Sequence, residues 1–343
     1  MDLGGRRDNS VAFVFPGQGS QYVGMGRDLY EASPAARQVF EEAEDALGVD
    51  LPKLCFEGPE DVLQDTINAQ PAVLTVSIAC LEALRERWQS LGINVVPRFT
   101  AGHSLGQYSA LVAAGSLQFR EAVQLVRERG RLMKESGEAH PGGMAAVIGL
   151  DASVLESLCQ RVRAQGIVCP ANFNSPVQTV ISGELAALSA ATQLALAEGA
   201  RRVVQLAVSI AAHSPLMQRA AEQFAEILAR FAPRDARVPV ISNVTAQALT
   251  SAEAIQADLA AHIIRSVRWV QSVREMVGYG VTAFVEIGPG QVLAGLIRGI
   301  SQDVSVVSIG DLKSLQRRIP LLDPSTNQRR LLAQEPRPPE VGL

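Results

Sequence analysis

The stretch that decides the fold runs from residue 100 to residue 109 and reads Thr100-Ala101-Gly102-His103-Ser104-Leu105-Gly106-Gln107-Tyr108-Ser109. Its centre matches G-x-S-x-G, the nucleophile elbow, in which a serine sits on a sharp turn between a strand and a helix. Apolar residues before the turn suit a strand, and the alanine-rich segment after it suits a buried helix. Glycines flank such a serine because neighbouring backbone leaves no room for a β-carbon. A bare match also occurs in unreactive glycine-rich turns, so it is this context that favours a nucleophile at Ser104.

Length and composition indicate a large α/β protein. A chain of 343 residues suggests one large domain with an insertion, or two domains. Hydrophobic residues make up 47%, aromatic residues only 5%, and 28 glycines allow helices to pack closely on a sheet. The net charge of −4 shows neither the footprint of a nucleic-acid partner nor a polybasic membrane patch. We therefore expect no nucleic-acid partner.

Cysteine and histidine usage argues against metal sites and disulfides. The four cysteines, Cys55, Cys80, Cys159 and Cys169, lack C-x-x-C spacing, and the four histidines lack the spacing of metal ligands. The apolar run at 11–15 is too short for a signal peptide, and the sequence suggests no continuous apolar span of about 18 residues. We expect a cytoplasmic protein without a membrane segment.

Several strands end in glycine-containing loops, as in open parallel sheets. Residues 11–15 form a continuous apolar run followed by Pro16-Gly17-Gln18-Gly19, and residues 282–287 are followed by Gly288-Pro289-Gly290. A further strand is predicted at 238–243. Ligands bind at the carboxyl edge of such sheets, so Gln18 is a candidate for the cleft. A phosphate-binding loop is disfavoured because no Gly-Lys-Ser/Thr follows.

Helical periodicity covers much of the first half of the chain. We predict a helix over 27–48, with an N-cap at Ser33 and a stop near Gly48, and a second over 72–91 after Gln70-Pro71. The first delivers the chain towards the second, and the second leads to the elbow strand.

A helix predicted over 119–136 carries Arg127, Arg129 and Arg131. Most such side chains are solvated, but one that faced the cleft could hold a substrate carboxylate in a bidentate pair. Periodicity does not select which one.

Residues 143–206 show a pattern of their own. The predicted elements are a strand at 144–148, a helix at 151–164 capped by Asp151, strands at 167–169 and 178–181 joined by a loop at 172–176, a helix at 184–198 and a strand at 201–206. This order, β-α-β-β-α-β, is the ferredoxin-like arrangement. We predict a main domain from 1–140 and 207–310, an inserted subdomain at 141–206, and a largely disordered tail at 311–343.

His213 is the best-placed general base in the sequence. It precedes a predicted helix whose first turn contains Pro215. A lone histidine is more often structural, but His140 lies in a Pro-Gly-Gly loop and His262 on a helix with apolar neighbours. Neither has a comparable setting beside an elbow serine.

Together these segments resemble one known family. The motifs that carry the resemblance are Phe15-Pro16-Gly17-Gln18-Gly19-Ser20-Gln21, Gln70-Pro71-Ala72, Gly102-His103-Ser104-Leu105-Gly106, Arg129-Gly130, Ala171-Asn172-Phe173-Asn174-Ser175-Pro176, His213-Ser214-Pro215-Leu216-Met217 and Glu286-Ile287-Gly288-Pro289-Gly290. In this order they are similar to those of malonyl-CoA:acyl-carrier-protein transacylases of fatty-acid synthesis and of polyketide synthases. The match spans roughly residues 11–300. It implies a hydrolase-like parallel-sheet main domain with an inserted ferredoxin-like subdomain.

The resemblance also assigns roles to residues. It implies Ser104 as nucleophile, His213 as general base, the backbone N–H groups of Gln18 and Leu105 as oxyanion hole, and Arg129 as the substrate-carboxylate site. The family orients its histidine with a backbone carbonyl. The matching position here, before a tryptophan, is Arg268, where the family usually has glutamine.

The implied reaction moves malonyl from malonyl-CoA to the phosphopantetheine thiol of an acyl carrier protein by a ping-pong course. It needs no bound cofactor and no metal. We expect a monomer, and we expect the acidic carrier protein to meet basic residues, with Arg161, Arg163, Arg201, Arg202 and Arg298 as candidates.

Some alternatives stay open. Ala212 stands where many malonyl-specific members have phenylalanine, which leaves methylmalonyl or another extender possible. An acyl hydrolase of the same fold that edits carrier proteins is a rival, although such members tend to lose the arginine. A non-catalytic scaffold is disfavoured by the presence of Ser104, His213 and Arg129.

Overall fold

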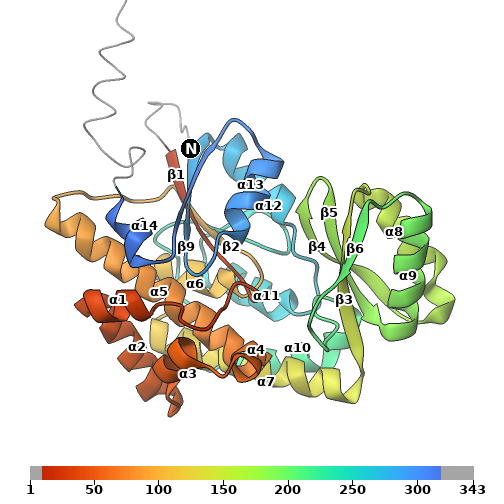
Figure 1. Ribbon diagram of the computed structural model, residues 1–343, viewed down its shortest axis with the longest axis horizontal. Helices are drawn as coiled ribbons and strands as arrows, with labels where there is room; N and C mark the ends of the chain where they lie inside the picture. The colour runs from red at the N-terminus through yellow and green to blue at the C-terminus, as the bar shows by residue number, and fades with distance from the viewer. Residues whose placement is uncertain (1–9, 318–343) are drawn as a thin grey trace, which may run out of the picture.

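Two β-sheets frame the chain, whose computed structural model describes residues 10–317 (Figure 1). The larger sheet has six strands in the order β10-β9-β1-β2-β7-β8, and every neighbouring pair is parallel except β7 and β8. Its strands are β1 (Ser10–Phe15), β2 (Phe99–Gly102), β7 (Val240–Ile241), β8 (Ala248–Leu249), β9 (Val281–Ile287) and β10 (Ser305–Ile309). The parallel sheet predicted from the apolar runs is confirmed.

Helices cover both faces of this sheet, because successive side chains of a strand point to opposite sides. Phe13 and Phe15 of β1 belong to one hydrophobic core, whereas Ala12 and Val14 belong to another. The first core is closed by α1 (Arg27–Ala32), α2 (Pro34–Leu47), α3 (Leu51–Glu57), α4 (Glu60–Gln64), α5 (Thr66–Ser90), α6 (Gly106–Ala113), α7 (Phe119–Ala139), α10 (Gln218–Leu228) and α11 (Ala252–His262). The second is closed by α12 (Trp269–Gly278) and α13 (Val292–Ile300). The result is a three-layer α/β/α body.

The predicted helix over 27–48 is two helices. Ser33 is the N-cap of α2, and its Oγ accepts a hydrogen bond from the Ala36 N–H at 3.1 Å. Its extended backbone divides the helical stretch into α1 and α2, so the predicted cap at Ser33 is confirmed. The stop at Gly48 is also confirmed, with a left-handed φ of 63°.

Helix α5 begins earlier than the sequence suggested. It starts at Thr66, with Asp65 as its N-cap, and Pro71 lies inside it. Proline was expected to mark the start, but Pro71 lies in the second turn, beyond the unpaired donors of the first turn, so the helix tolerates the loss of one internal backbone hydrogen bond. The earlier start places Gln70 on a buried helical turn.

Helix α5 is also long and apolar enough to cross a membrane by length and composition, contrary to the expectation that no stretch approaches that test. Most of its apolar window is buried inside the structure. It packs against α2 and α7, which is how a core helix of a globular protein behaves.

The smaller sheet is antiparallel, with strand order β4-β5-β3-β6. Its elements are β3 (Gly142–Ile148), α8 (Ala152–Arg161), the 3₁₀ turn η1 (Arg163–Gln165), β4 (Val168–Ser175), β5 (Gln178–Glu184), α9 (Leu185–Ala197) and β6 (Arg202–Gln205). The element order matches the β-α-β-β-α-β prediction, with α8 and α9 packed on one face over a core of their own. The boundaries at 141 and 206 stay a prediction.

Local details differ from expectation within the smaller sheet. Residues 172–175 belong to β4 and not to a loop, and Asp151 precedes α8 without a capping hydrogen bond from its side chain. Strand β4 also bridges to the larger body, because the N–H of Phe173 donates to the carbonyl of Val267 at 2.9 Å. In Figure 1 the smaller lobe therefore stands beside the carboxyl ends of the main sheet.

The end of the described chain is more ordered than predicted. Residues 312–316 form helix α14 (Leu312–Gln316), whose N-cap Asp311 and Ser314 make a reciprocal capping box. The remainder of the predicted tail, from residue 318, lies outside the described residues.

Candidate active site

The elbow adopts the strained turn that its sequence predicts. Strand β2 ends at Gly102, α6 starts at Gly106, and Ser104 between them has a left-handed φ of 49°. A β-carbon on Gly102 would lie 1.9 Å from the Gly106 backbone, and one on Gly106 would lie 2.1 Å from the carbonyl oxygen of Phe15. Both glycines are therefore required by close backbone approach, and the turn pushes Ser104 out at the end of the strand.

His213 lies against this serine. The Oγ of Ser104 and the Nε2 of His213 are 2.8 Å apart, although the residues are 109 positions apart in sequence. His213 directly precedes Ser214, the N-cap of the 3₁₀ turn η2 (Pro215–Met217); it has a left-handed φ of 59° and donates its backbone N–H to the carbonyl of Ile263 at 3.0 Å. The pair has the geometry of a nucleophile and its base.

Two backbone carbonyls, those of His262 and Arg265, orient the imidazole. Each lies 3.0 Å from the Nδ1 of His213. The carbonyl of Arg268, which the resemblance put in this role, instead accepts the N–H of Ser272 in the first turn of α12. The assignment of Arg268 is therefore wrong, because that carbonyl points along its own helix.

The surroundings of His213 keep its ring neutral. Burial, reinforced by the nearby Arg129 cation, lowers the pKa of His213 to about 3. With its proton on Nδ1, directed at the carbonyls, the ring presents Nε2 to the serine as an acceptor. The imidazole can thus take the Ser104 proton at neutral pH.

The N–H groups of Gln18 and Leu105 are unpaired. Within residues 10–317, neither backbone N–H donates to a protein acceptor, although their neighbours Gly19 and Gly106 do. Gln18 follows β1 and its side chain accepts from the Thr66 hydroxyl at 2.9 Å, which fixes the loop. Two free donors at the ends of adjacent strands suit an oxyanion.

Arg129 is a buried cation beside the nucleophile. It projects from α7, is 1% exposed, and its Nη2 lies 3.3 Å from the Oγ of Ser104. Its Nη1 donates to the Oε1 of Gln70 at 2.7 Å, its Nε has no partner, and it forms no ion pair within the described residues. Burial lowers the pKa of this guanidinium. A buried charge without a counter-ion is costly, so the site favours an anionic ligand.

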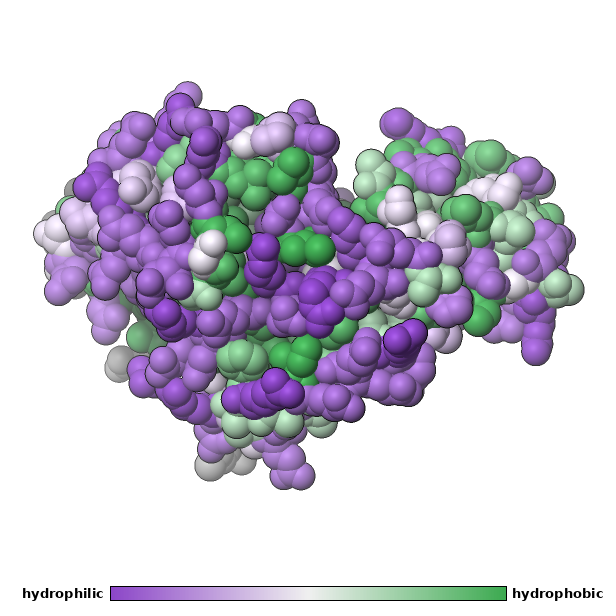
Figure 2. Space-filling model, turned by 90° about the horizontal axis from the view of Figure 1, so that it is seen from below, coloured by the Kyte–Doolittle hydropathy of each residue, from purple (hydrophilic) through white to green (hydrophobic). Residues whose placement is uncertain are grey.

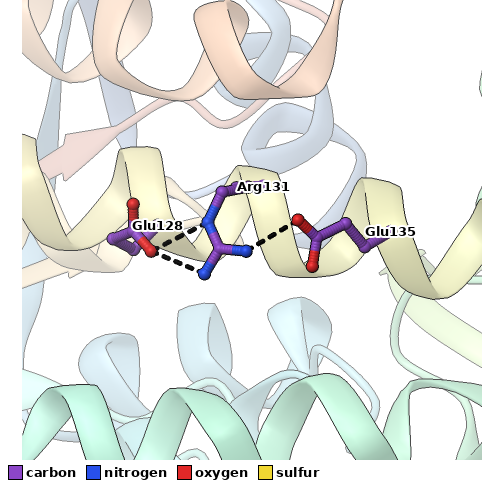
Figure 3. A network of polar contacts seen from close by, with 3 residues as sticks. All are labelled: Glu128, Arg131 and Glu135. Atoms are coloured by element: carbon purple, nitrogen blue, oxygen red, sulfur yellow. Dashed lines mark hydrogen bonds and ion pairs between the residues drawn. The ribbon is translucent and has the colours of Figure 1, made fainter.

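The other two arginines of this helix have different surroundings. Arg131 is held by Glu128 at 2.8 Å and Glu135 at 2.7 Å on the outer face of α7 (Figure 3). Arg127 makes a long contact to Asn68 at 3.4 Å. Among the three arginines that periodicity left open, the structure brings only Arg129 to the serine.

A cavity of about 470 Å³ joins these groups. It is lined on one side by the loop at 17–21 and the catalytic pair, and on the other by residues of the smaller sheet such as Met144 and Asn174. Figure 2 shows the larger body and the smaller lobe as separate masses with a notch between them. The exposed Val292 and its neighbour Leu293, from α13, also line the cavity.

The sequence analysis missed several polar residues around the serine. Gln70 holds Arg129, and Asn243, Gln107 and His262 lie in a buried network behind the elbow. The sequence predicted Asn243 only as the end of a strand, placed His262 on a helix with apolar neighbours, and gave Gln107 no role. No local pattern marks them, because their partners lie from 19 to 151 positions away in sequence.

The cysteines stand apart from this chemistry. Cys55, Cys80 and Cys159 are buried and Cys169 is partly buried, all as free thiols. Burial raises the pKa of Cys169 to about 11, so its thiol is a poor nucleophile. In the part of the chain from 10 to 317, no group of three or more His, Cys, Asp and Glu side chains is placed to hold a metal.

Comparison with known proteins gives a consistent result. The acyl transferase domain family matches residues 12–329. A malonyl CoA-acyl carrier protein transacylase of Bacillus subtilis is 44% identical over 92% of this chain and 98% of its own length. One of Staphylococcus aureus is 40% identical over 90% of this chain and 98% of its own.

Solved structures agree. The malonyl CoA-acyl carrier protein transacylase of Coxiella burnetii superposes with a TM-score of 0.87 at 39% identity, over 92% of this chain and 98% of that one. A malonyl-transacylase solved in complex with a type II polyketide acyl-carrier protein gives a TM-score of 0.84 at 43% identity, over 89% and 97%. The chain is therefore an acyltransferase that belongs to the malonyl-CoA:acyl-carrier-protein transacylase family.

Proposed function

We propose that this enzyme transfers a malonyl group from malonyl-CoA to the phosphopantetheine thiol of an acyl carrier protein, through an ester on Ser104. The observation that carries the substrate choice is Arg129, a buried cation 3.3 Å from the nucleophile with no anionic partner in the described chain. The free carboxylate of malonyl supplies that partner, and acetyl has none to offer.

In the first half-reaction, the malonyl carboxylate binds Arg129 and its thioester carbonyl faces Ser104. As Oγ attacks the carbonyl carbon, His213 takes the hydroxyl proton on Nε2. The N–H groups of Gln18 and Leu105 receive the developing oxyanion. The tetrahedral intermediate collapses, the C–S bond breaks, and the imidazolium returns its proton to the departing CoA thiolate.

The second half-reaction runs through the same groups. The phosphopantetheine thiol gives its proton to His213, and its sulfur attacks the malonyl ester carbon. The C–O bond to Ser104 then breaks, and the serine oxygen recovers the proton from His213. Enzyme and base return to their starting state, which is the ping-pong course.

In this reaction Gln18 and Leu105 bind the oxyanion, and His213 is the base. The enzyme uses a CoA thioester and holds no resident cofactor. It acts in the cytoplasm as a monomer. The Bacillus subtilis relative is named for an acyl carrier protein without a pathway, and one solved relative is bound to a type II polyketide acyl-carrier protein, so carrier proteins of fatty-acid and of polyketide synthesis are both candidate partners.

The carrier protein is proposed to approach over the smaller lobe. Of the basic candidates there, Arg161 already pairs with Glu198 at 2.8 Å, whereas Arg163, Arg201 and Arg202 form no ion pair within residues 10–317. Arg298, on α13, donates to the carbonyl of Val306 at 3.3 Å. The unpaired three are the better docking residues.

A second substrate has one observation in its favour. Ala212 lines the cavity directly beside His213, and its small side chain leaves space near the α-carbon of the acyl group. A methyl branch fits there, so methylmalonyl is the alternative extender to test.

The experiment is intact-protein mass spectrometry with malonyl-, methylmalonyl- and acetyl-CoA, followed by addition of holo carrier protein. We expect malonyl to load on the wild type, to fail on Ser104→Ala, and to leave only when carrier protein is added. Arg129→Gln is expected to lower malonyl loading by roughly 100-fold while acetyl loading changes little. The matched control is Arg131→Gln on the same helix.

Two results contradict the proposal. An acyl-enzyme that disappears in buffer alone identifies a hydrolase. Equal loading of malonyl by wild type and Arg129→Gln removes the carboxylate site from Arg129.

A further inference from the structure

Asn243 lies directly behind the nucleophile and contacts the elbow backbone at Gly102 and at Ser104. Its Oδ1 accepts the Ser104 N–H at 2.7 Å, and its Nδ2 donates to the carbonyl of Gly102 at 2.7 Å. The side chain is 1% exposed. One amide thus pairs both backbone groups that the strained turn removes from regular hydrogen bonding.

The elbow needs such a support. A left-handed φ at a non-glycine residue costs on the order of 1–3 kcal/mol and persists only where surroundings enforce it. Ser104 is such a residue, and its N–H has no other acceptor in the described chain. Without Asn243, a buried donor and a buried acceptor are left unpaired, and relaxation of the turn moves Oγ away from His213.

Asn243 is itself held from two directions. Its backbone N–H donates to the Oε1 of Gln107 at 2.8 Å, and its carbonyl accepts the N–H of Arg268 at 2.9 Å. Gln107 belongs to the first turn of α6 and donates to the Oδ2 of Asp258 at 2.6 Å. The Ser242 hydroxyl donates to the other oxygen of this carboxylate. The amide therefore has little freedom to follow a relaxing turn.

The same cluster reaches the general base. His262 lies one turn after Asp258 on α11, and its Nε2 is 3.3 Å from the Oδ1 of Asn243. Its carbonyl receives the Nδ1 of His213, and the two imidazole rings lie 5.4 Å apart. His262 thus connects Asn243, which holds the backbone of Ser104, with the imidazole of His213.

We propose that Asn243 is a positioning residue that holds Ser104 in its left-handed conformation and in register with His213. The proposal concerns acyl transfer from Ser104 and rests on the proposed function only for the substrate used in its kinetic arm. Asn243 is not among the residues that line the cavity, so we expect its loss to affect turnover and not substrate binding.

The test compares Asn243→Ala, Asn243→Asp and Ser272→Ala with the wild type. Ser272 is a matched control, because its buried hydroxyl bonds to the carbonyls of Arg268 and Ser242 and not to the elbow. The first measurement is the rate at which phenylmethylsulfonyl fluoride, which carries no carboxylate, labels Ser104. The second is kcat and KM for malonyl-CoA, with Tm recorded for every variant.

We expect Asn243→Ala to lower both the labelling rate and kcat by on the order of ten- to hundredfold, with KM changed less than about threefold. Asn243→Asp keeps an oxygen for the Ser104 N–H and loses the donor to Gly102. It is therefore expected to react faster than Asn243→Ala even if its buried charge lowers Tm further. Ser272→Ala is expected to lose stability and keep its labelling rate.

The proposal is overturned if Asn243→Ala is labelled as fast as Ser272→Ala. It is also overturned if the labelling rates of the variants rank in the order of their Tm, so that Asn243→Asp gains nothing from the oxygen that it keeps for the Ser104 N–H. Failure of malonyl loading in the wild type contradicts the proposed function but leaves the labelling comparison valid. The two failures are thus distinguishable.

Discussion

The two walls of the cavity use their polar atoms in opposite ways. Behind the nucleophile, the backbone groups of Gly102 and Ser104 are both paired through Asn243. On the substrate side, the N–H groups of Gln18 and Leu105 and the Nε of Arg129 have no acceptor in the described chain. The paired groups hold the backbone of the nucleophile in place, and the unpaired groups are available to bind a ligand. The backbone around the nucleophile is therefore fixed by hydrogen bonds, whereas the substrate side keeps free donors for a ligand.

Removal of the general base is expected to lower the reaction rate more than any other change considered. His213→Ala leaves both walls in place but removes the acceptor of the Ser104 proton. We expect the rate of acyl-enzyme formation to fall by about 10⁴-fold or more. Rapid-quench mass spectrometry measures it, with the exposed His140→Gln as control. A loss under tenfold contradicts the dyad.

A β-carbon at Gly102 breaks the reacting wall by sterics. It would lie 1.9 Å from the Gly106 backbone, so the turn must shift. We expect Gly102→Ala to lower the free energy of unfolding by about 3 kcal/mol or more and to abolish Ser104 labelling. Gly295→Ala, in an open position of α13, is the control and is expected to stabilise by about 0.5–1 kcal/mol. Urea unfolding measures both, and equal effects would remove the steric argument.

A charge placed in the paired wall tests its network. Gln107→Glu exchanges the amide donor for a second carboxylate facing Asp258, whose pKa burial already raises. The folded pair then binds a proton more tightly than the unfolded chain, so this contribution to stability is present at low pH and lost as pH rises through the folded pKa. Relative to wild type, we expect a destabilisation of about 1–3 kcal/mol at pH 8 that shrinks at pH 5.5. Gln271→Glu, which adds the same charge on an exposed turn, controls for charge alone.

The pH profile of the wild type sharpens the comparison further. Because the pKa of His213 is lowered to about 3, the base stays neutral, and Ser104 labelling is expected to show no inflection near pH 6.5. In the unfolded chain the imidazole has its ordinary pKa of about 6.5 and takes up a proton. Its contribution to stability is therefore full above pH 6.5 and lost as pH falls towards 3. The rate of Ser104 labelling and the midpoint of urea unfolding are measured from pH 5 to 8. A labelling rate that titrates with a pKa near 6.5 would falsify the neutral-base interpretation.

Arg131 gives the smallest expected effect, although it lies two residues from Arg129. Its ion pairs with Glu128 and Glu135 are exposed to solvent on the outer face of α7. We expect Arg131→Gln to change the free energy of unfolding by less than about 1 kcal/mol and to leave malonyl loading unchanged. A loss of loading comparable to that of Arg129→Gln would show that helix charge, and not position, governs the site.

The sequence predicted the framework because its signals are local. The elbow at 102–106, the apolar strands and the cap at Ser33 each depend on neighbours within a few residues, and the structure places them as expected. The start at Thr66 was missed because a proline favours a helix start, whereas the buried α5 continues through Pro71. Ser104, His213 and Arg129 were found by motif, and the structure brings them together.

The supporting residues could not be predicted in the same way. Asn243 is 139 positions from Ser104, and Gln107 is 151 positions from Asp258, so no periodicity links them. The error at Arg268 has a related cause. A backbone carbonyl exists at every residue, and only the path of the chain decides which one reaches the imidazole.

That imidazole has neutral partners on its inner side. The carbonyls of His262 and Arg265 fix the ring without placing a counter-ion against it, so a protonated ring is poorly stabilised and the proton is readily passed on. The group released to solvent is a thiol in both directions: CoA in the forward reaction and the carrier-protein thiol in the reverse reaction. A thiol has a pKa of about 8.5, so its thiolate leaves with little help from an acid. The Ser104 oxygen, which leaves in the second half-reaction, is the group that needs the proton held by the imidazolium. The enzyme is thereby suited to exchange an acyl group between thiols.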